Sequence, residues 1–421
     1  MKANSHTIIL GGGIIGLCSA YFAARRGHRV TVVDRSPAVR DGCSFGNAGM
    51  VVPSHFTPLA APGMVALGLK WMWNPESPFY IKPRLDPALL AWGYRFWRSA
   101  TPHHVKRSAP LLRDLHLASR AAYEELAALP GMDFGLVRRG LLMLCRTEHA
   151  LEEESAMAAQ ARALGIPADV LDPRQTAALD PAVTMAVAGS VHYPKDCHLS
   201  PGQFMAALER EAVRMGVEFR WGQEVVSAQR ASDGRIAALR LESGEALGGD
   251  QFVLAAGSWS EGLARSLGLK IPLQAGKGYS LTVTHPRQLP ALCSIFTEAR
   301  VAVTPMGGSL RFGGTMEIAG LNEHINPARV RGIIRSVPEY FPEFTPEDFE
   351  GIAPWRGLRP CSPDGLPYLG RSARHPNLVV ATGHAMMGLS LGPVSGRIVA
   401  DLVSEEPPGF DLAMLAPERF A

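Results

Sequence analysis

The sequence predicts an α/β fold in which a domain built on a parallel sheet is interrupted by a second, α+β domain. Segments that combine a strand with a helix occur near residues 7–34, 200–257 and 377–403. Their apolar runs are continuous rather than alternating, which is typical of parallel strands covered on both faces. Two long excursions separate these segments, and we expect the excursions to fold together as the second domain.

The first of these segments has the pattern of a dinucleotide site. Its glycines are spaced Gly11-x-Gly13-x-x-Gly16 after an apolar strand, and Asp34 ends the next strand. The first glycine permits a tight turn, the second lets a pyrophosphate approach the backbone, and the third packs helix against strand. A helix that begins near Ile14 would turn its positive end toward the phosphates. Asp34 favours a free ribose 2′-hydroxyl, so this Rossmann-like unit predicts FAD or NAD.

Composition excludes several classes of protein. With 421 residues, of which 47% are hydrophobic and 19% charged, the chain can bury a large core and form two domains. A net charge of +3 with dispersed Lys and Arg argues against nucleic acid as a partner. The six cysteines show neither a C-x-x-C pair nor a zinc spacing. We therefore expect no metal, and reduced thiols in a cytoplasmic protein.

Membrane insertion is not expected. No run approaches the roughly 20 apolar residues that span a bilayer, and the apolar N-terminus contains the three glycines, as a folded element does. Residues 59–73 are apolar and aromatic enough to lie on a membrane surface. A cap over the active site is an equally good use of this segment.

The other elements follow in chain order. Leu and Ala recurring at three and four residues predict helices over about 106–129 and 148–164, whose His and Glu side chains we expect on solvated faces. A buried strand is predicted between them at 140–145. Ser200-Pro201 predicts the start of a helix that ends near Gly216, before a strand at 217–221.

The second half of the chain is richer in strands. Turn residues at 232–234 and 243–244 predict an antiparallel meander, and the apolar run 252–257 predicts a central parallel strand whose end faces a ligand. Further elements are predicted as strands over 278–315, a helix near 327–336, a buried strand at 377–384, and a helix from about Gly388 to Val403.

Taken together, the motifs resemble those of the D-amino-acid oxidase and glycine oxidase superfamily of flavoproteins, and most of all its bacterial D-amino-acid dehydrogenase small subunits. The resemblance extends over nearly the whole chain, through the fingerprint and the segments 47–53, 60–63, 69–72, 276–282, 355–365 and 382–384. The stretch Gly383 to Pro393 departs from those subunits and is similar to the branch that acts on D-hydroxyproline.

This resemblance implies a Rossmann-like FAD-binding domain interrupted by an α+β substrate domain with a mostly antiparallel sheet. The FAD-binding domain is expected to comprise residues 1–62, 197–262 and 350–421, and the substrate domain residues 63–196 and 263–349. The residues expected to bind FAD are Gly11, Gly13, Ile14, Ile15, Gly16, Asp34, Arg35, Ser44, Gly46, Asn47, Ala48, Gly49, Met50, Val225, Ala256, Gly257, Gly383, His384, Gly388, Leu389 and Ser390.

Three residues are expected to act on the substrate. Arg359 matches the position that binds the substrate carboxylate in the glycine oxidase branch, and a guanidinium can hold a carboxylate with two parallel donors. Tyr279 is expected as a second carboxylate or amine contact, with a core tyrosine as the alternative. His55, like His384, flanks the expected pocket, with a structural histidine as the alternative.

The implied reaction is oxidation of the Cα–N bond of a D-amino or cyclic D-imino acid, with D-proline or cis-4-hydroxy-D-proline favoured, by hydride transfer to flavin N5. A quinone or another non-oxygen acceptor would take the electrons. We expect a cytoplasmic protein, with peripheral contact to the inner face of the membrane and a hetero-oligomer as open alternatives. Other readings are an oxygen-using oxidase of the glycine or sarcosine type, an electron-transfer subunit of a larger complex, and an NAD-dependent dehydrogenase.

Overall fold

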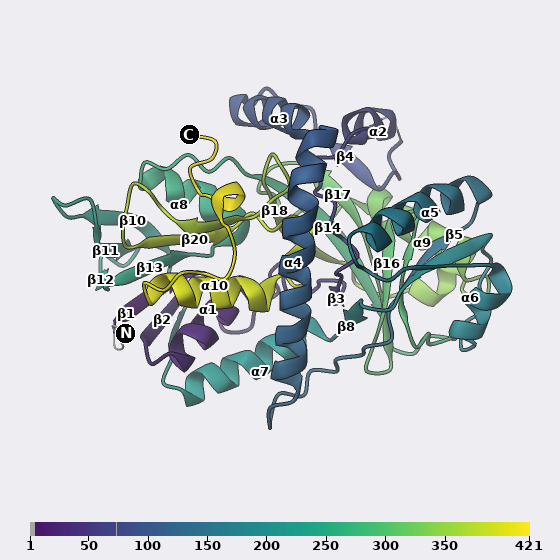
Figure 1. Cartoon of the computed structure of the whole chain (residues 1–421), viewed down its shortest axis with the longest axis horizontal. Coiled ribbons are helices and arrows are strands. Elements are labelled where there is room, and N and C mark those ends of the chain that lie inside the picture. The colour runs from purple at the N-terminus through teal and green to yellow at the C-terminus, as the bar shows by residue number, and fades with distance from the viewer. Residues whose placement is uncertain (1–4, 73) are drawn as a thin grey trace.

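Two large sheets organise the described part of the chain, which comprises residues 5–72 and 74–421 of a computed structural model (Figure 1). The first sheet runs in the order β19-β20-β13-β1-β2-β9. All neighbours are parallel except β19, which is antiparallel to β20. Its strands are β1 His6–Leu10, β2 Arg29–Asp34, β9 Glu218–Trp221, β13 Gln251–Leu254, β19 Tyr368–Arg371 and β20 Leu378–Thr382.

Both faces of the first sheet are covered, which explains its continuous apolar strands. Ile9 points to a core shared with α1 (Ile14–Arg25), α7 (Pro201–Arg214) and α10 (Gly392–Val403). Its neighbours Ile8 and Leu10 point to the opposite core, under α8 (Ser260–Ser266) and an antiparallel meander. The strands of that meander are β10 Val225–Arg230, β11 Ile236–Leu241 and β12 Ala246–Gly248.

The second sheet is mostly antiparallel and runs in the order β18-β14-β17-β16-β15-β5-β7-β6, with β4 beside β17. The pairs β15–β5 and β17–β4 are parallel. Its strands are β4 Phe79–Ile81, β5 Leu141–Cys145, β6 Asp169–Leu171, β7 Gly189–Tyr193, β14 Gln274–Val283, β15 Cys293–Phe296, β16 Val301–Met306, β17 Ser309–Ile318 and β18 Trp355–Cys361. Strands β3 (Met50–Val51) and β8 (Cys197–His198) form a separate, short antiparallel pair.

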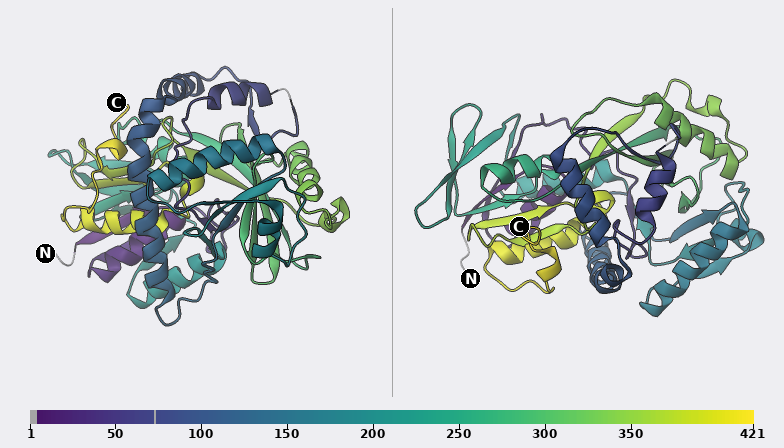
Figure 2. Two further views of the ribbon diagram at one scale, coloured as in Figure 1. Left: turned by 45° about the vertical axis from the view of Figure 1, so that its right-hand side comes forward. Right: turned by 90° about the horizontal axis from the view of Figure 1, so that it is seen from above.

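The two faces of the second sheet have different partners. One face packs on α9 (Pro327–Tyr340) through an aromatic core that includes Phe312 and Tyr340. The other face, which includes Met143 of β5, receives Phe56 from the loop after β3 and helix α5 (Glu148–Ala163). The long helix α4 (Pro102–Ala127) runs down the molecule between the two halves (Figures 1 and 2). The remaining helices are α2 Met64–Trp71, α3 Pro87–Ser99 and α6 Pro173–Leu179.

The sequence predicted the interrupted α/β architecture correctly, but three details differ. The last helix begins at Gly392 rather than Gly388, because a short 3₁₀ turn occupies Ala385–Met387. Strand β18 lies in the range assigned to the FAD-binding domain, yet it pairs with β14 in the second sheet. His116 of α4 is fully buried instead of solvated. Trp73, at the end of the apolar segment, lies outside the described residues.

Candidate functional site

A cavity of about 540 Å³ opens at the carboxyl ends of the first sheet's parallel strands. This is the edge at which doubly wound sheets bind their ligands. Its wall combines the turn after β1, the end of β2, the turn after β13 and the loop after β20. Among the described residues, no group of three or more His, Cys, Asp or Glu side chains is arranged to hold a metal ion.

The glycine turn after β1 leaves no room for side chains at Gly11, Gly12 and Gly16. Gly11 has φ +111°, and a Cβ there would lie 2.4 Å from the carbonyl oxygen of Ala255. A Cβ on Gly16 would lie 1.8 Å from the carbonyl oxygen of Gly11, so the third glycine lets the helix pack closely on the turn. Helix α1 has no side-chain cap at Gly13, and the Ile14 N–H donates to Ser44 Oγ at 3.1 Å. Its open N-terminus suits an anion.

Asp34 is held at the cavity wall by backbone donors. Its Oδ2 accepts from the Gly12 N–H at 2.6 Å, and its Oδ1 accepts from the Ser36 N–H at 2.7 Å. Next to it, the Arg35 guanidinium stacks 4.1 Å from the ring centre of Trp259, and both residues line the cavity. The carboxylate is therefore fixed at the end of β2, where a ribose is expected.

Two side chains on the cavity wall, Arg40 and His384, have buried polar atoms with no partner among the described residues, and both suit FAD. Nε and Nη1 of Arg40 are buried without a hydrogen bond among the described residues, while Nη2 is paired with Glu209. The same guanidinium stacks 3.9 Å from the Trp221 ring, which also closes off Gly12. Leaving two cationic donors buried and unpaired is costly. A pyrophosphate bound beside the glycine turn would pair them, so these donors fit that part of FAD.

The second group is His384, at the other end of the cavity. Its Nε2 is bonded to Ser395 Oγ at 2.9 Å, whereas its buried Nδ1 has no partner in the described structure. Burial lowers the pKa of this imidazole to about 3, so the ring is neutral. Because His384 lines the cavity, its neutral, unpartnered ring nitrogen suits a hydrogen bond with the polar edge of a flavin. The residues present therefore fit FAD at both ends of the cavity.

The predicted cofactor residues divide into two groups. Those that line the cavity are Gly11, Gly13, Ile14, Ile15, Asp34, Arg35, Ser44, Asn47, Val225, Ala256, Gly257, His384, Gly388 and Leu389. Those that lie outside its lining are Gly16, Gly46, Ala48, Gly49, Met50, Gly383 and Ser390. Ser390 instead bonds to the Val52 N–H and to His116. The predicted helix start at Gly388 was wrong, since α10 begins at Gly392.

Sequence reasoning missed several lining residues. Gly12, Ser36, Arg40, Cys43 and Trp259 all line the cavity. The signal was available in part, because Gly12, Ser36 and Trp259 directly follow the ends of strands predicted to face a ligand. Arg40 and Cys43 lie in an irregular loop, and no local pattern marks them.

Arg359 lies beside the cavity on β18, in a place shaped by two neighbouring strands. Its guanidinium covers Gly278 of β14, where a Cβ would be 2.2 Å from Nη2. Its Nη1 donates to the Thr315 carbonyl oxygen at 2.5 Å. Thr315 has φ +70° at a β-bulge in β17, an unusual conformation for a β-branched residue, and the bulge re-aims its carbonyl group. The flanking Leu358 and Pro360 line the cofactor cavity.

Tyr279 does not join Arg359. Successive side chains of a strand point to opposite faces, so Tyr279 faces away from the surface where Arg359 covers Gly278. Its hydroxyl donates to Glu317 Oε2 at 2.6 Å and accepts from the Asn326 N–H at 3.2 Å, in the core beneath α9. Its expected role as a substrate contact was wrong. A separate 510 Å³ cavity, lined by Lys277 and Glu317 among others, lies on that side.

His55 belongs to a hydrogen-bonded group with Ser54 and Asp196. Its Nδ1 lies 3.0 Å from Ser54 Oγ, and Ser54 Oγ donates to Asp196 Oδ2 at 2.5 Å. Burial, and then the charge of Arg300, lower the pKa of His55 to about 4. Burial raises the pKa of Asp196 to about 7, although hydrogen bonds from Ser54 oppose the shift.

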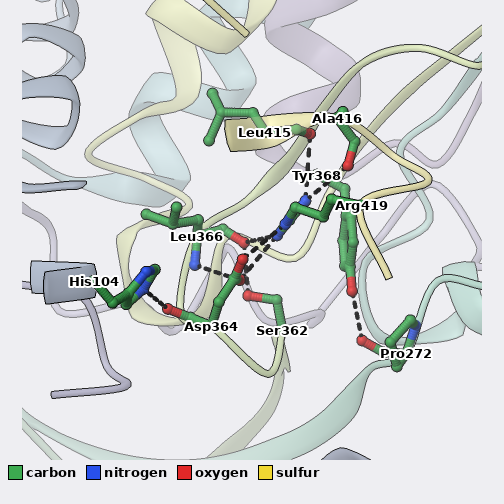
Figure 3. Close-up of polar contacts among 9 residues, drawn as sticks. All are labelled: His104, Pro272, Ser362, Asp364, Leu366, Tyr368, Leu415, Ala416 and Arg419. Atoms are coloured by element: carbon green, nitrogen blue, oxygen red, sulfur yellow. Dashed lines mark hydrogen bonds and ion pairs between the residues drawn. The ribbon is translucent and has the colours of Figure 1, made fainter. Parts of the chain in front are cut away.

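The loop after β18 is anchored by the C-terminal segment. Arg419 Nε and Nη2 bond to the Asp364 carboxylate at 2.8 and 2.9 Å, and the guanidinium stacks 4.0 Å from the Tyr368 ring (Figure 3). His104 Nε2 meets the Asp364 carbonyl oxygen from α4 at 2.8 Å. The strand that carries Arg359 is therefore followed by a rigidly held turn.

Known proteins share this architecture. Residues 6–402 match the family model described as DAO, FAD dependent oxidoreductase. D-amino acid dehydrogenase of Methylobacterium radiotolerans is 35% identical over 421 residues, covering 99% of this chain and 100% of that protein. The D-amino acid dehydrogenase of Paramagnetospirillum magneticum is 36% identical over 423 residues, covering 98% of each chain.

Among solved structures, glycine oxidase from Geobacillus kaustophilus aligns with a TM-score of 0.79 at 25% identity, over 99% of this chain and 100% of that one. L-proline dehydrogenase from P. horikoshii aligns with a TM-score of 0.74 at 16% identity, over 100% of this chain and 98% of that one, and shows the fold alone. Because the family model spans nearly the whole chain and the cavity fits its cofactor, this chain belongs to the DAO family of FAD-dependent oxidoreductases.

Proposed function

We propose that this enzyme oxidises the Cα–N bond of a D-amino acid or a cyclic D-imino acid and passes the electrons to an acceptor other than oxygen. The observation that carries the proposal is full-length similarity, at about 35% identity, to proteins named D-amino acid dehydrogenase. FAD, when bound, supplies the redox chemistry by accepting the hydride from Cα. The residues of the chain must hold the substrate and accept the proton that the substrate's ammonium group loses.

Arg359 is the proposed carboxylate-binding residue. Its Nη1 is occupied by the Thr315 carbonyl oxygen, so Nη2 and Nε remain to hold a carboxylate. Two donors in one plane fix the carboxylate and thereby orient Cα. Positioning of this kind can supply a large part of the rate acceleration.

The proposed substrates are D-proline and cis-4-hydroxy-D-proline, ahead of acyclic D-amino acids. The support is the sequence of the loop Gly383 to Pro393, which resembles the D-hydroxyproline branch. A cyclic substrate would leave as a pyrroline, whereas an acyclic imine would hydrolyse to a 2-oxo acid and ammonia.

Anaerobic reduction of the bound flavin tests the proposal. The purified holoenzyme is mixed with the D- and L-enantiomers of several amino acids. It is also mixed with D-proline and with the cis and trans epimers of 4-hydroxy-D-proline. Loss of the flavin absorbance near 450 nm with D-substrates, fastest with the cyclic ones, is the expected result. Bleaching by L-enantiomers alone would contradict the proposal. Turnover of the isolated chain with a dye acceptor would argue against a purely electron-transferring subunit.

We further propose that the electron acceptor is a quinone, which the enzyme would reach at an anionic membrane surface. Leu90, Tyr94 and Trp97 form one exposed face of α3, at 65%, 57% and 62% exposure. Arg98, Lys106 and Arg107 are exposed close by in sequence, and α2 lies at the same end of the molecule (Figures 1 and 2). Aromatic and basic side chains together suit an interfacial helix. Within the described residues, the helices are too short or too polar to cross a bilayer.

Vesicle binding tests this face. Sedimentation with vesicles containing anionic lipid should retain the wild type and release a Leu90→Ser/Trp97→Ser variant. Val213→Ser, an exposed apolar position on α7, is the matched control. Equal binding of both variants would remove α3 from the interface.

An oxygen-using oxidase is the second candidate, because glycine oxidase from Geobacillus kaustophilus aligns over the whole chain at 25% identity. Hydrogen peroxide formed in proportion to substrate would establish that reading and overturn the non-oxygen acceptor.

A further inference from the structure

A buried carboxylate lies in the turn between β7 and β8. Asp196 is fully buried just before β8, and Ser54 donates to it twice, from its N–H at 3.1 Å and from its hydroxyl at 2.5 Å. Arg120 acts on it only through a weaker charge interaction, and Asp196 forms no ion pair with a described residue. An unpaired buried carboxylate is costly when ionised, so this group is a ready proton acceptor.

The hydrogen bonds fix the state of His55. When Asp196 is ionised, the single Ser54 hydroxyl proton points to its carboxylate, and Ser54 Oγ then accepts from His55 Nδ1–H. The lone pair of His55 is then on Nε2. No described residue bonds to Nε2, and the imidazole is partly exposed. His55 therefore presents a hydrogen-bond acceptor at the outer end of a chain that leads inward to Asp196.

This chain of hydrogen bonds is connected to the loop after β20, part of which lines the cofactor cavity. His55 N–H donates to the Val52 carbonyl oxygen at 3.0 Å, and the Val52 N–H donates to Ser390 Oγ at 2.9 Å. Ser390 follows Leu389, which lines the cofactor cavity. The buried His116 bonds to the same Ser390 Oγ at 2.8 Å and interacts electrostatically with His55. His55 is thus connected by hydrogen bonds, through Val52 and Ser390, to the loop after β20, in which Leu389 lines the cofactor cavity.

We propose that His55, Ser54 and Asp196 form a proton relay that takes the proton from the substrate ammonium group before Cα is oxidised. The proposal rests on the proposed function. The N–H bond of the ammonium breaks and a bond to His55 Nε2 forms. At the same time, the Nδ1 proton passes to Ser54 Oγ and the Ser54 proton passes to Asp196 Oδ2. One proton moves from nitrogen to carboxylate, no electrons are transferred, and His55 changes tautomer while remaining neutral.

The relay resolves a conflict in the electrostatics. His55 is a poor base on its own, because burial and then Arg300 lower its pKa to about 4. A concerted transfer never makes the imidazolium cation. The other groups around Asp196 stay fixed in charge, because the pKa values of Tyr193, Cys197 and Cys293 are all raised by burial. The proton therefore ends on the group whose burial favours it.

Asp196→Asn tests the relay because an amide cannot take up the proton. In the wild type, kcat/KM should rise with pH through about 7, where Asp196 ionises. The variant should lose this step and about 100-fold in kcat/KM near neutral pH, the usual scale of general base catalysis. Its activity should recover as the pH approaches the pKa of the substrate amine, since the free amine needs no relay. Binding of a carboxylate inhibitor should be unchanged.

Two further variants separate the relay from simple folding effects. Ser54→Thr keeps the hydroxyl and should keep the pH step, whereas Ser54→Ala should lose it. Asp180→Asn changes another buried aspartate, which bonds to backbone N–H groups of Ala291 and Leu292 at 2.8 and 2.9 Å, and should leave the profile unchanged. A uniform loss of activity at every pH in Asp196→Asn would overturn the relay.

An NMR readout distinguishes failure of the relay from failure of the proposed function. In ¹⁵N-histidine-labelled holoenzyme without substrate, His55 should carry its proton on Nδ1 above about pH 7 and on Nε2 below it, because protonated Asp196 reverses the chain. Asp196→Asn should abolish the switch. A pH-independent tautomer would reject the relay even if D-amino acids reduce the flavin. A tautomer switch in an enzyme that D-amino acids do not reduce would reject the substrate instead.

Discussion

Arg359 owes its position to its neighbours more than to its own strand. The absence of a side chain at Gly278 gives the guanidinium a surface to lie on, and the Thr315 carbonyl oxygen holds one of its nitrogens. The sequence predicted this arginine as a carboxylate-binding residue through its resemblance to a family motif, and that role stays a prediction. The bulge at Thr315 could not be foreseen, because it depends on the register between β14 and β17, which are distant in sequence.

Substitutions at Arg359 and Gly278 should therefore act alike. Arg359→Lys keeps the charge but loses the planar fork, and Gly278→Ala places a Cβ where Nη2 now lies. We expect each to raise KM by about 10- to 100-fold, the value of a charge-assisted hydrogen bond of ~1.5–3 kcal/mol. Steady-state kinetics with a D-substrate measure the effect. Gly202→Ala, where a Cβ meets nothing within 4 Å, is the control, and an unchanged KM in both variants would remove Arg359 from carboxylate binding.

Asp196 should also affect stability, with a sign opposite to that of most aspartates. Its pKa rises from 3.8 to about 7 because burial disfavours the charge, so the folded state binds the proton more tightly than the unfolded state. The resulting stability is fully present below about pH 4 and is lost as the pH rises through about 7. Asp196→Asn should gain stability relative to the wild type across that window. Thermal unfolding at pH 5 and pH 8 measures the difference, with the exposed Asp233→Asn as a reference that shows no such trend.

Tyr279 and His116 show what residue patterns could and could not decide. Tyr279 was assigned to the substrate side because it lies in a motif, but the parity of β14 points it to the core beneath α9. Alternation along β14 gives Tyr279 and Gly278 opposite faces, but the sequence does not show which of the two faces meets the cofactor. His116 could have been found, because it lies one helical turn after Leu112 and shares the buried stripe with Leu115 and Ser119.

At the scale of elements, local signals fixed most helices and left their tertiary pairing open. Pro393 lies at the first turn of α10, a position that proline favours, so the sequence did contain the signal for a start at Gly392. Strand β18 lies in the range assigned to the FAD-binding domain but pairs with β14 of the second sheet, for a different reason. Its partner β14 ends more than seventy residues earlier, and nothing local to β18 states that pairing.

The turn after β18 offers a test of element docking. Asp364 and Arg419 are 8% and 10% exposed, and Arg419 also bonds to the carbonyl oxygens of Leu366, Leu415 and Ala416. Arg419→Ala would leave a buried carboxylate unpaired, which costs about 3–5 kcal/mol. Chemical denaturation should show that loss. Arg265→Ala removes the pair between exposed Arg265 and partly buried Glu261, on the surface of α8, and should cost about 0.5 kcal/mol or less. Similar losses in the two variants would mean that the C-terminal anchor is not energetically distinct.

At the scale of the whole molecule, the cofactor cavity is where the parts of the fold converge. Its wall includes residues from the start of the chain, such as Gly11, and from its last quarter, such as Leu358 and His384. Arg311 of β17 also donates to the carbonyl oxygens of Phe45 and Asn47 at 3.1 and 2.8 Å, joining the second sheet to the loop after β2. The interrupted order of the domains was predictable from three strand and helix segments. The convergence on one cavity required the fold.

FAD should accordingly stabilise the protein as a unit, and Arg40 should carry part of that effect. Ligand that binds only the folded state adds about 2.7 kcal/mol at a concentration of 100 Kd. Removing FAD should lower Tm, and adding it back should restore Tm in a concentration-dependent manner. Arg40→Gln removes the two unpaired donors beside the glycine turn, so it should weaken FAD binding by about tenfold or more and shrink the gap between apo and holo Tm. Because Arg40 also pairs with Glu209, that gap is the informative quantity rather than Tm itself. Exposed Arg210→Gln on α7 is the matched control, and an unchanged gap in Arg40→Gln would show that its donors do not reach the cofactor.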